Sequence, residues 1–192
     1  FLKEAIFSSW KEPGEGEHKI FEYIRKNNHQ NETTFVYGLD ADLIMLSICH
    51  LKYCNNLYLY RETPEFIKSI DSSLEPNESY ILDINYLGEQ IYCLLKNNIN
   101  ATKSEILEDY IFLCFMLGND FMPHFPSLNI RTNGIFHLME CYNEYMTESI
   151  IKNGKINWKV FRYFISKIIN FEKTWITQEY DELVKKEGKI FK

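Results

Sequence analysis

Four short segments of the chain combine apolar residues with turn-forming residues beside them, a pattern typical of β-strands. These segments are residues 5–10, 33–38, 56–62 and 80–84. β-branched and aromatic residues are frequent within them, and such residues favour strands. The second segment ends at Gly38, immediately before a group of acidic residues. The pattern therefore predicts four strands, with polar side chains close to where some of them end.

Apolar residues recur at helical spacing between these segments. The predicted helices follow Pro13, cover residues 41–52, and run from about residue 104 to 117. Strands that alternate with helices are typical of a parallel sheet flanked by helices. We therefore predict an α/β fold with a mostly parallel sheet in residues 1–130, and a helical extension of the same region over residues 131–192.

Composition indicates a folded protein and leaves its partner open. The 192 residues are 16% aromatic and 25% charged, and no apolar run approaches the roughly 18 residues of a membrane helix. The five cysteines include no CxxC pair, which favours a reducing compartment, so we expect an intracellular protein of the cytoplasm or nucleus. The chain begins with Phe1, and we expect it to be an internal piece of a longer protein.

Acidic residues occur where predicted elements begin or end. Glu15 and Glu17 lie at a loop-to-helix junction, and Asp40 and Asp42 follow a predicted strand. Asp120 follows Gly-Asn at residues 118–119, a pair that typically ends a helix. Ligands of parallel sheets bind beyond the carboxyl ends of the strands. Clustered carboxylates repel one another unless a cation accepts their oxygens. The pattern therefore predicts a metal-dependent nuclease.

Hydrolysis of a phosphodiester with two divalent ions about 3.5–4 Å apart requires carboxylates from several segments. One ion lowers the pKa of the attacking water, and the other stabilises the leaving oxygen. The five acidic residues suit this role, and no histidine, serine or cysteine nucleophile is then needed. The net charge of −6 gives no general attraction for nucleic acid, so Arg25, Lys26 and Arg131 are expected to meet phosphates locally.

Each acidic residue also has a purely structural interpretation. Glu15 and Glu17 are compatible with a solvated helix start, Asp40 with an N-cap, and Asp120 with a solvated turn. His18 can orient Glu17 or simply lie on a helix surface.

Two aromatic residues, Phe121 and Phe125, follow Asp120. We interpret them as rigid packing around a cleft floor and prefer this to a base-stacking platform.

Three motifs together resemble the Xrn-type 5′-to-3′ exoribonucleases. They are PGEGEHKI at residues 13–20, YGLDADLI at 37–44 and LGNDFMPH at 117–124. Their order and approximate spacing also agree, and the likeness extends through residues 59–61 and 154–157.

The resemblance implies a PIN/FEN-like nuclease core with Glu15, Glu17, Asp40, Asp42 and Asp120 as metal ligands. The cofactor would be Mg²⁺ or Mn²⁺, as two ions, and the substrate single-stranded RNA with a 5′-monophosphate. In similar enzymes the remaining ligands and the phosphate pocket precede this region, so we expect the chain alone to be inactive. No membrane partner is expected, and the sequence identifies no protein partner.

Two other functions remain open on sequence grounds. A flap-type DNA endonuclease uses a related carboxylate cluster and cleaves branched DNA. The residue sequence of the first motif argues against this function. A catalytically silent scaffold that holds RNA or a protein would keep the fold without binding metal. The presence of all five carboxylates disfavours this scaffold.

Overall fold

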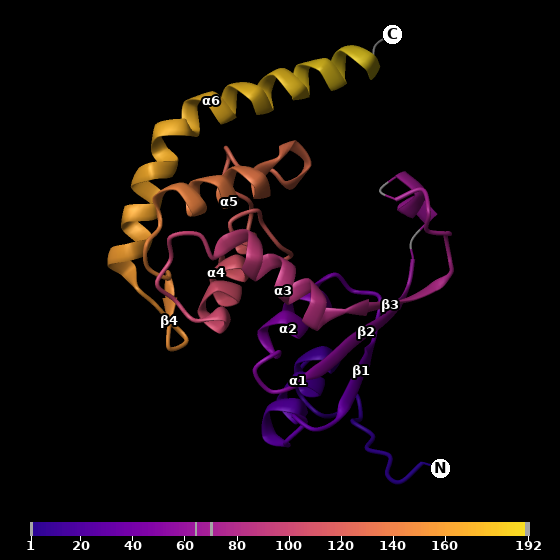
Figure 1. Ribbon diagram of the computed structural model, residues 1–192. Helices are drawn as coiled ribbons and strands as arrows, with labels where there is room; N and C mark the ends of the chain where they lie inside the picture. The colour runs from indigo at the N-terminus through magenta and orange to yellow at the C-terminus, as the bar shows by residue number, and fades with distance from the viewer. Residues whose placement is uncertain (1, 64, 70, 191–192) are drawn as a thin grey trace. The chain divides into compact units, whose positions relative to one another are not determined.

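The computed structural model describes residues 2–63, 65–69 and 71–190 (Figure 1), without the side chains of Phe66, Ser69, Arg131 and residues 186–190. The chain divides after Gly88 into two compact units. We call residues up to Gly88 the N-terminal unit and those from Glu89 onward the C-terminal unit. The fold is mixed α/β, and the three-stranded sheet belongs to the N-terminal unit. The functional boundary expected at residue 130 stays a prediction.

The sheet of the N-terminal unit has the order β1-β2-β3. Its strands are β1 (Thr33–Tyr37), β2 (Asn56–Glu62) and β3 (Ser79–Asp83), which confirms three of the four predicted strands. β1 and β2 are parallel, but β2 and β3 are antiparallel. The expectation of a mostly parallel sheet is therefore wrong for these strands. A parallel pair needs a crossover, usually a helix, whereas β2 and β3 are joined through the short 3₁₀ helix η1 (Glu65–Ser69).

The fourth predicted strand, at residues 5–10, is not a strand in the structure. Its apolar side chains lie in solvent, with Phe7 87% and Trp10 90% exposed. The chain then turns, and the Glu12 amide donates to the carbonyl of Ser9 over 3.0 Å. An apolar, β-branched composition gives no strand without a neighbouring strand to pair with, and the described residues provide none here.

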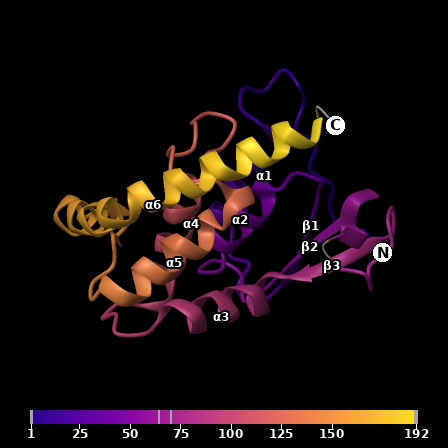
Figure 2. The ribbon, with the colours of Figure 1, turned by 90° about the horizontal axis from the view of Figure 1, so that it is seen from above.

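Helices α1 (Gly16–Lys26) and α2 (Asp42–Cys49) lie on one side of the sheet (Figure 1 and Figure 2). α1 contacts α2, and α2 contacts β2. The core between them contains fully buried Phe21 from α1 and Leu57 and Leu59 from β2. Leu57 and Leu59 point to one face because side chains alternate along a strand. Both helices agree with the periodicity of the sequence.

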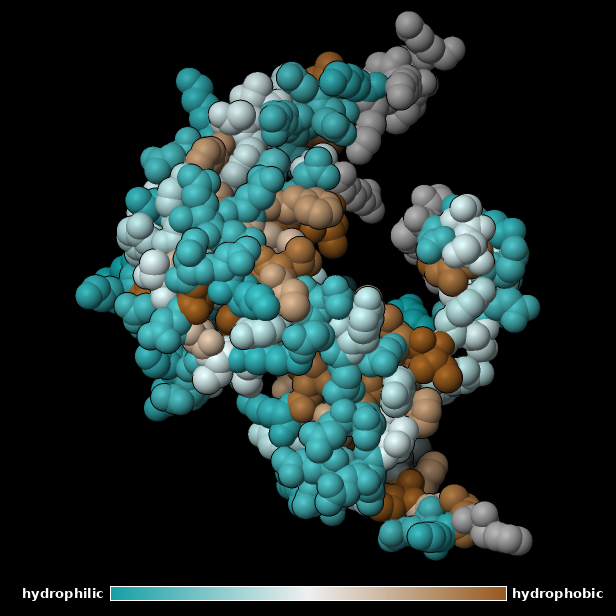
Figure 3. Space-filling model, viewed as in Figure 1, coloured by the Kyte–Doolittle hydropathy of each residue, from teal (hydrophilic) through white to brown (hydrophobic). Residues whose placement is uncertain are grey.

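Hydrophobic residues lie at the surface over the strands of the N-terminal unit (Figure 3). Phe35 and Tyr37 of β1 and Ile81 of β3 are each more than half exposed. The Phe35 ring stacks on Tyr58 of β2 with ring centroids 5.1 Å apart. The helices therefore cover only one face of this sheet among the described residues.

Helix α3 (Ile84–Leu95) leads into the C-terminal unit, which is mainly helical. The unit contains α4 (Lys103–Phe115), the 3₁₀ helix η2 (Ile130–Thr132), α5 (Gly134–Tyr145), a hairpin of β4 (Ile151–Lys152) and β5 (Lys155–Ile156), and α6 (Trp158–Ile190). α4 and α6 confirm the helices expected from the sequence. Among the described helices, none has both the length and the hydropathy to cross a bilayer.

A buried carboxylate holds the C-terminal unit together. Asp109 of α4 is fully buried, and its carboxylate accepts hydrogen bonds from the Tyr142 hydroxyl of α5 and from the amides of Ile150 and Ile151 at 2.8 and 2.6 Å. Burial raises the pKa of Asp109, while these donors act in the opposite direction. The network joins α4, α5 and β4.

Candidate metal-binding site

The loop before α1 places Glu15 and Glu17 at the start of the helix. Gly14 has φ of +98°, a left-handed conformation that favours glycine. The Lys19 ammonium donates to the carbonyl oxygen of Glu12 over 2.8 Å and closes the loop onto α1. Glu15 is the N-cap residue, but its side chain makes no capping hydrogen bond. The Glu15 carboxylate is therefore not used to cap the helix.

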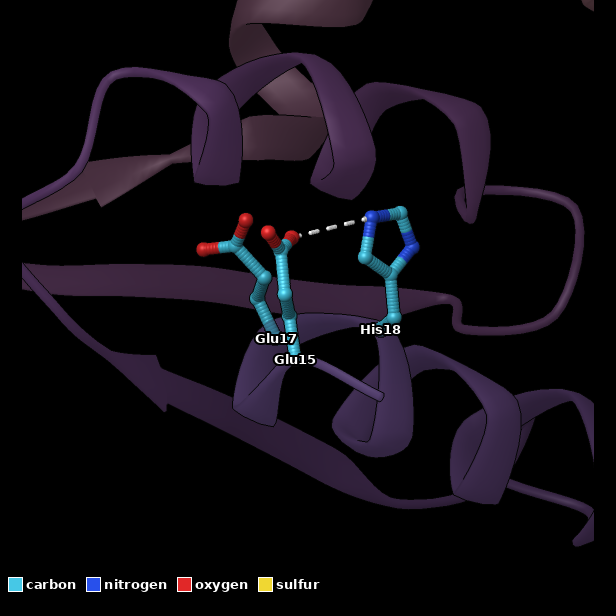
Figure 4. A group of neighbouring side chains, drawn as sticks. All are labelled: Glu15, Glu17 and His18. Carbon is cyan, nitrogen blue, oxygen red and sulfur yellow. Dashed lines mark ion pairs between the residues drawn. The ribbon is translucent and has the colours of Figure 1, made fainter. Parts of the chain in front are cut away.

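Glu15, Glu17 and His18 form a compact group of side chains (Figure 4). One ligand atom from each lies within 4.8 Å of the others. The two carboxylates point to the same side of α1, and His18 Nε2 lies 3.4 Å from Glu15 Oε2. Glu15 and His18 are mostly exposed. His18 thus pairs with Glu15, whereas the sequence suggested Glu17 as its partner.

Asp40 lies in the turn between β1 and α2, and Asp42 is the first residue of α2. The amide of Asp42 donates to Asp40 Oδ1 over 3.2 Å, so one oxygen of Asp40 holds the turn before α2. The N-cap residue of α2 is Ala41, so Asp40 is not the N-cap residue that the structural interpretation expected. Gly38 precedes this turn, and a Cβ there would lie 2.3 Å from Cδ1 of Leu43. The turn is therefore narrow because α2 packs closely against the end of β1.

The two pairs of carboxylates interact electrostatically. The pKa of Glu17 is raised above its ordinary value, first by partial burial and then by the negative charges of Asp40, Glu15 and Asp42, with His18 acting in the opposite direction. A carboxylate is affected in this way only by charges that lie nearby. The charges of Asp40 and Asp42 therefore reach Glu17, whereas the ligand atoms that lie within 4.8 Å of one another come from Glu15, Glu17 and His18, all in the N-terminal unit.

Asp120 lies in the C-terminal unit, on an exposed loop after α4. The side chain of Asn119 accepts hydrogen bonds from the amides of Phe121 and Met122 at 2.9 and 2.8 Å and folds this loop. Gly118 has φ of +88°, and a Cβ there would lie 2.8 Å from the backbone nitrogen of His124. The loop thus has a defined conformation, and the convergence of Asp120 with the other four carboxylates stays a prediction.

Comparison with known proteins finds two family models in this chain. The model described as "XRN 5'-3' exonuclease N-terminus" matches residues 3–63, and the one described as "Xrn1 helical domain" matches residues 101–190. The chain belongs to the Xrn family. Residues 3–63 include Glu15, Glu17, Asp40 and Asp42, and residues 101–190 include Asp120.

Curated Xrn relatives are similar over most of this chain. The 5′-3′ exoribonuclease 1 of Schizosaccharomyces pombe is 34% identical over 93% of the chain, and that of Saccharomyces cerevisiae is 34% identical over 92%. The 5′-3′ exoribonuclease 1 of Homo sapiens is 32% identical over 96% of the chain. The matched region spans only 14%, 13% and 12% of these three proteins, respectively.

The exposure of the two aromatic residues after Asp120 in this Xrn-family chain differs from the expectation that they pack around a cleft floor. Phe121 is 82% exposed and Phe125 is 44% exposed, so neither is packed into a core of the described residues. The hydrogen bonds of Asn119 set the loop conformation, and they leave both rings at the surface. The local sequence does not indicate the exposure of these rings, because aromatic residues near prolines occur both in protein cores and at surfaces.

Sequence reasoning missed two contacts among the elements that carry the carboxylates of this Xrn-family chain. Arg61 of β2 donates from Nη2 to the carbonyl oxygen of Leu39 over 2.7 Å, directly before Asp40. Nε2 of His50, after α2, accepts a 2.7 Å hydrogen bond from Nη1 of Arg25. Both contacts join residues more than 20 positions apart, so no local pattern indicates them. Arg25 was expected to meet phosphate, but its described partner is His50.

Proposed function

We propose that this chain forms part of the catalytic region of a metal-dependent exoribonuclease that hydrolyses 5′-monophosphorylated RNA from the 5′ end. The observation that carries the proposal is the group of Glu15, Glu17 and His18, whose ligand atoms lie within 4.8 Å of one another in a chain of the Xrn family. The negative charges of Glu15, Asp40 and Asp42 also repel that of Glu17. Repulsion of this kind lowers the stability of the folded chain unless a cation neutralises it. A pair of divalent ions requires carboxylates from separate segments of the chain. The four carboxylates of this chain come from the starts of two helices.

The residues present fit Mg²⁺ or Mn²⁺, which prefer oxygen ligands. Glu15 and Glu17 offer carboxylate oxygens from α1, and Asp40 and Asp42 offer them from the start of α2. The positive ends of both helix dipoles help to keep these groups ionised. Two bound ions would supply an activated water at neutral pH and charge stabilisation for the leaving oxygen.

Asp120 is the fifth ligand of the proposal, and it would bring the C-terminal unit into the reaction. Its loop is held by Asn119 and by the left-handed Gly118, so the backbone that carries the Asp120 carboxylate has a defined conformation within its unit. Residues 1–130 would then supply all five ligands within this chain. The likeness of this loop to the third family motif supports the assignment.

The test measures RNA degradation by the full-length protein, because the matched region is a small part of its relatives. The substrates are one RNA carrying a 5′-monophosphate and the same RNA with a 5′-hydroxyl, each with Mg²⁺. Asp40→Asn retains the hydrogen-bond acceptor for the Asp42 amide but removes the charge. We expect it to slow degradation by about 10²-fold or more. Asp181→Asn, an identical change on exposed α6, should leave the rate unchanged.

Three results would contradict the proposal. Undiminished degradation by the Asp40→Asn protein would remove this carboxylate from the chemistry. RNA binding without cleavage, and without uptake of divalent ions, would identify a silent scaffold. Cleavage of branched DNA but not of single-stranded RNA would identify a flap-type endonuclease.

A further inference from the structure

The C-terminal ends of α1 and α2 are joined by a hydrogen bond between Arg25 and His50. Arg25 lies in the last turn of α1, and His50 is the C-cap residue of α2. His50 is 5% exposed, and its ring lies 4.6 Å from the ring of Phe21, between centroids. The His50 ring therefore lies in the core between the two helices, whereas the Arg25 side chain that reaches it is exposed.

The hydrogen bonds of His50 determine its tautomer. Nδ1 lies 2.6 Å from the carbonyl oxygen of Leu46, which can only accept, so Nδ1 carries the hydrogen. Nε2 lies 2.7 Å from Nη1 of Arg25, which can only donate, so Nε2 accepts. A neutral imidazole meets both requirements, and burial together with the charges of Arg25 and Lys52 lowers the pKa of His50. His50 is thus a neutral bridge between α2 and Arg25.

The opposite ends of the same two helices carry the proposed metal ligands. Glu15 and Glu17 lie at the start of α1, and Asp40 and Asp42 lie at the start of α2. α1 has 11 residues and α2 has 8, so each helix is short and rigid. Movement of one helix relative to the other at the Arg25–His50 end would therefore change the spacing of the two carboxylate pairs.

We propose that His50 is a positioning residue, which holds α1 against α2 through Arg25 and so sets the distance between the two pairs of metal-binding carboxylates. The inference rests on the proposed function, since it assigns a role toward the same metal site. His50 and Arg25 touch neither metal nor RNA in this proposal. They act through the two helices, as the outer partners of metal ligands do elsewhere.

The test measures the Mn²⁺ affinity of the full-length protein by calorimetry, and the stability of each variant by urea denaturation. His50→Phe retains a ring against Phe21 but loses both hydrogen bonds, and Arg25→Met retains the length of the side chain but loses the donor. We expect each variant to lower Mn²⁺ affinity about 10-fold. The double variant should be no weaker than either single one, because both changes break the same contact.

Charge provides the first control. Removal of the positive Arg25 should by itself strengthen the attraction for a cation, so a loss of affinity has to come from geometry. Lys26→Met removes the same charge one residue away, where the side chain pairs with Glu22 and not with His50. This control should retain or slightly increase Mn²⁺ affinity.

Stability provides the second control. Tyr142→Phe breaks a buried hydrogen bond in the C-terminal unit and should destabilise the chain without changing Mn²⁺ affinity. Wild-type affinity in both His50→Phe and Arg25→Met would overturn the positioning role while leaving the metal site intact. Absence of Mn²⁺ binding by the wild-type full-length protein would overturn the proposed function itself.

Discussion

Arg61 donates a hydrogen bond from Nη2 to the carbonyl oxygen of Leu39 and thereby ties strand β2 to the turn that presents Asp40. The amide of Gly38 extends the same connection, since it donates to the carbonyl oxygen of Tyr60 over 3.3 Å. The turn after β1 is therefore held from the neighbouring strand as well as by the start of α2. This arrangement limits the positions that the Asp40 carboxylate can occupy.

Replacement of Arg61 by methionine tests this support. The Arg61→Met chain should lose about 1 kcal/mol of unfolding free energy, because the carbonyl of Leu39 loses its donor. It should also bind Mn²⁺ several-fold more weakly, although loss of a positive charge alone favours cation binding. Calorimetric titration measures the affinity, and Arg162→Met on α6 is the matched control. Unchanged affinity would show that the turn keeps its shape without Arg61.

Neutralisation of Asp40 should stabilise the metal-free chain. Asp40→Asn removes a charge that raises the pKa of Glu17, yet it retains an acceptor for the Asp42 amide. We expect the thermal midpoint to rise by about 1–3 °C without metal. Asp40→Ala also loses the acceptor, and we expect its midpoint to be lower than that of Asp40→Asn. Scanning calorimetry in a chelating buffer compares the three chains, and a lower midpoint for Asp40→Asn than for wild type would contradict the repulsion.

The raised pKa of Glu17 predicts how pH affects stability. The folded chain binds the Glu17 proton more tightly than the unfolded chain, whose carboxyl titrates near 4.5. As pH rises from 4.5 through the folded pKa, the metal-free chain should therefore lose the stability that protonated Glu17 contributes. Mn²⁺ affinity should increase over the same pH range, because metal and proton compete for the carboxylate.

Urea denaturation and Mn²⁺ titration at a series of pH values measure these two effects. Glu17→Gln cannot titrate, so both pH dependences should be reduced in this variant. Glu172→Gln, on exposed α6, should behave as wild type. Identical pH profiles for Glu17→Gln and wild type would assign the titration to another group.

The Asp109 network predicts a stability effect that is separate from metal binding. Tyr142→Phe removes one donor from a fully buried carboxylate and leaves it with the two amides of Ile150 and Ile151. We expect a loss of about 1–3 kcal/mol in the free energy of unfolding, measured by urea denaturation. Tyr163→Phe, on a partly exposed face of α6, should cost much less. Equal effects of the two changes would contradict the importance of the network.

The sequence predicted those parts of the fold that depend on local patterns. Alternation and turn residues located β1, β2 and β3, and helical spacing located α1, α2, α4 and α6. The segment at residues 5–10 has the composition of a strand, but strand formation depends on a partner elsewhere in space. The direction of β3 likewise depends on the path of its connection, which composition does not specify.

The site was predictable to the extent that its residues lie in short motifs. Glu15, Glu17, Asp40 and Asp42 each lie within two residues of a glycine or an element boundary, and the charges of the other three act on Glu17. The contact between Arg25 and His50 was not predictable, because it joins two residues that are unremarkable in their own segments. Its partners become visible only when α1 packs against α2.

The most direct test of the account is titration of the full-length wild-type protein with Mn²⁺, compared with the same protein carrying Glu17→Gln or Asp42→Asn. We predict that the wild-type protein binds Mn²⁺ and that each neutralised variant binds it at least about 10-fold more weakly. Glu172→Gln should bind it as the wild type does. Equal Mn²⁺ affinity in all four proteins, or no binding by the wild type, would contradict the assignment of these carboxylates to a metal site.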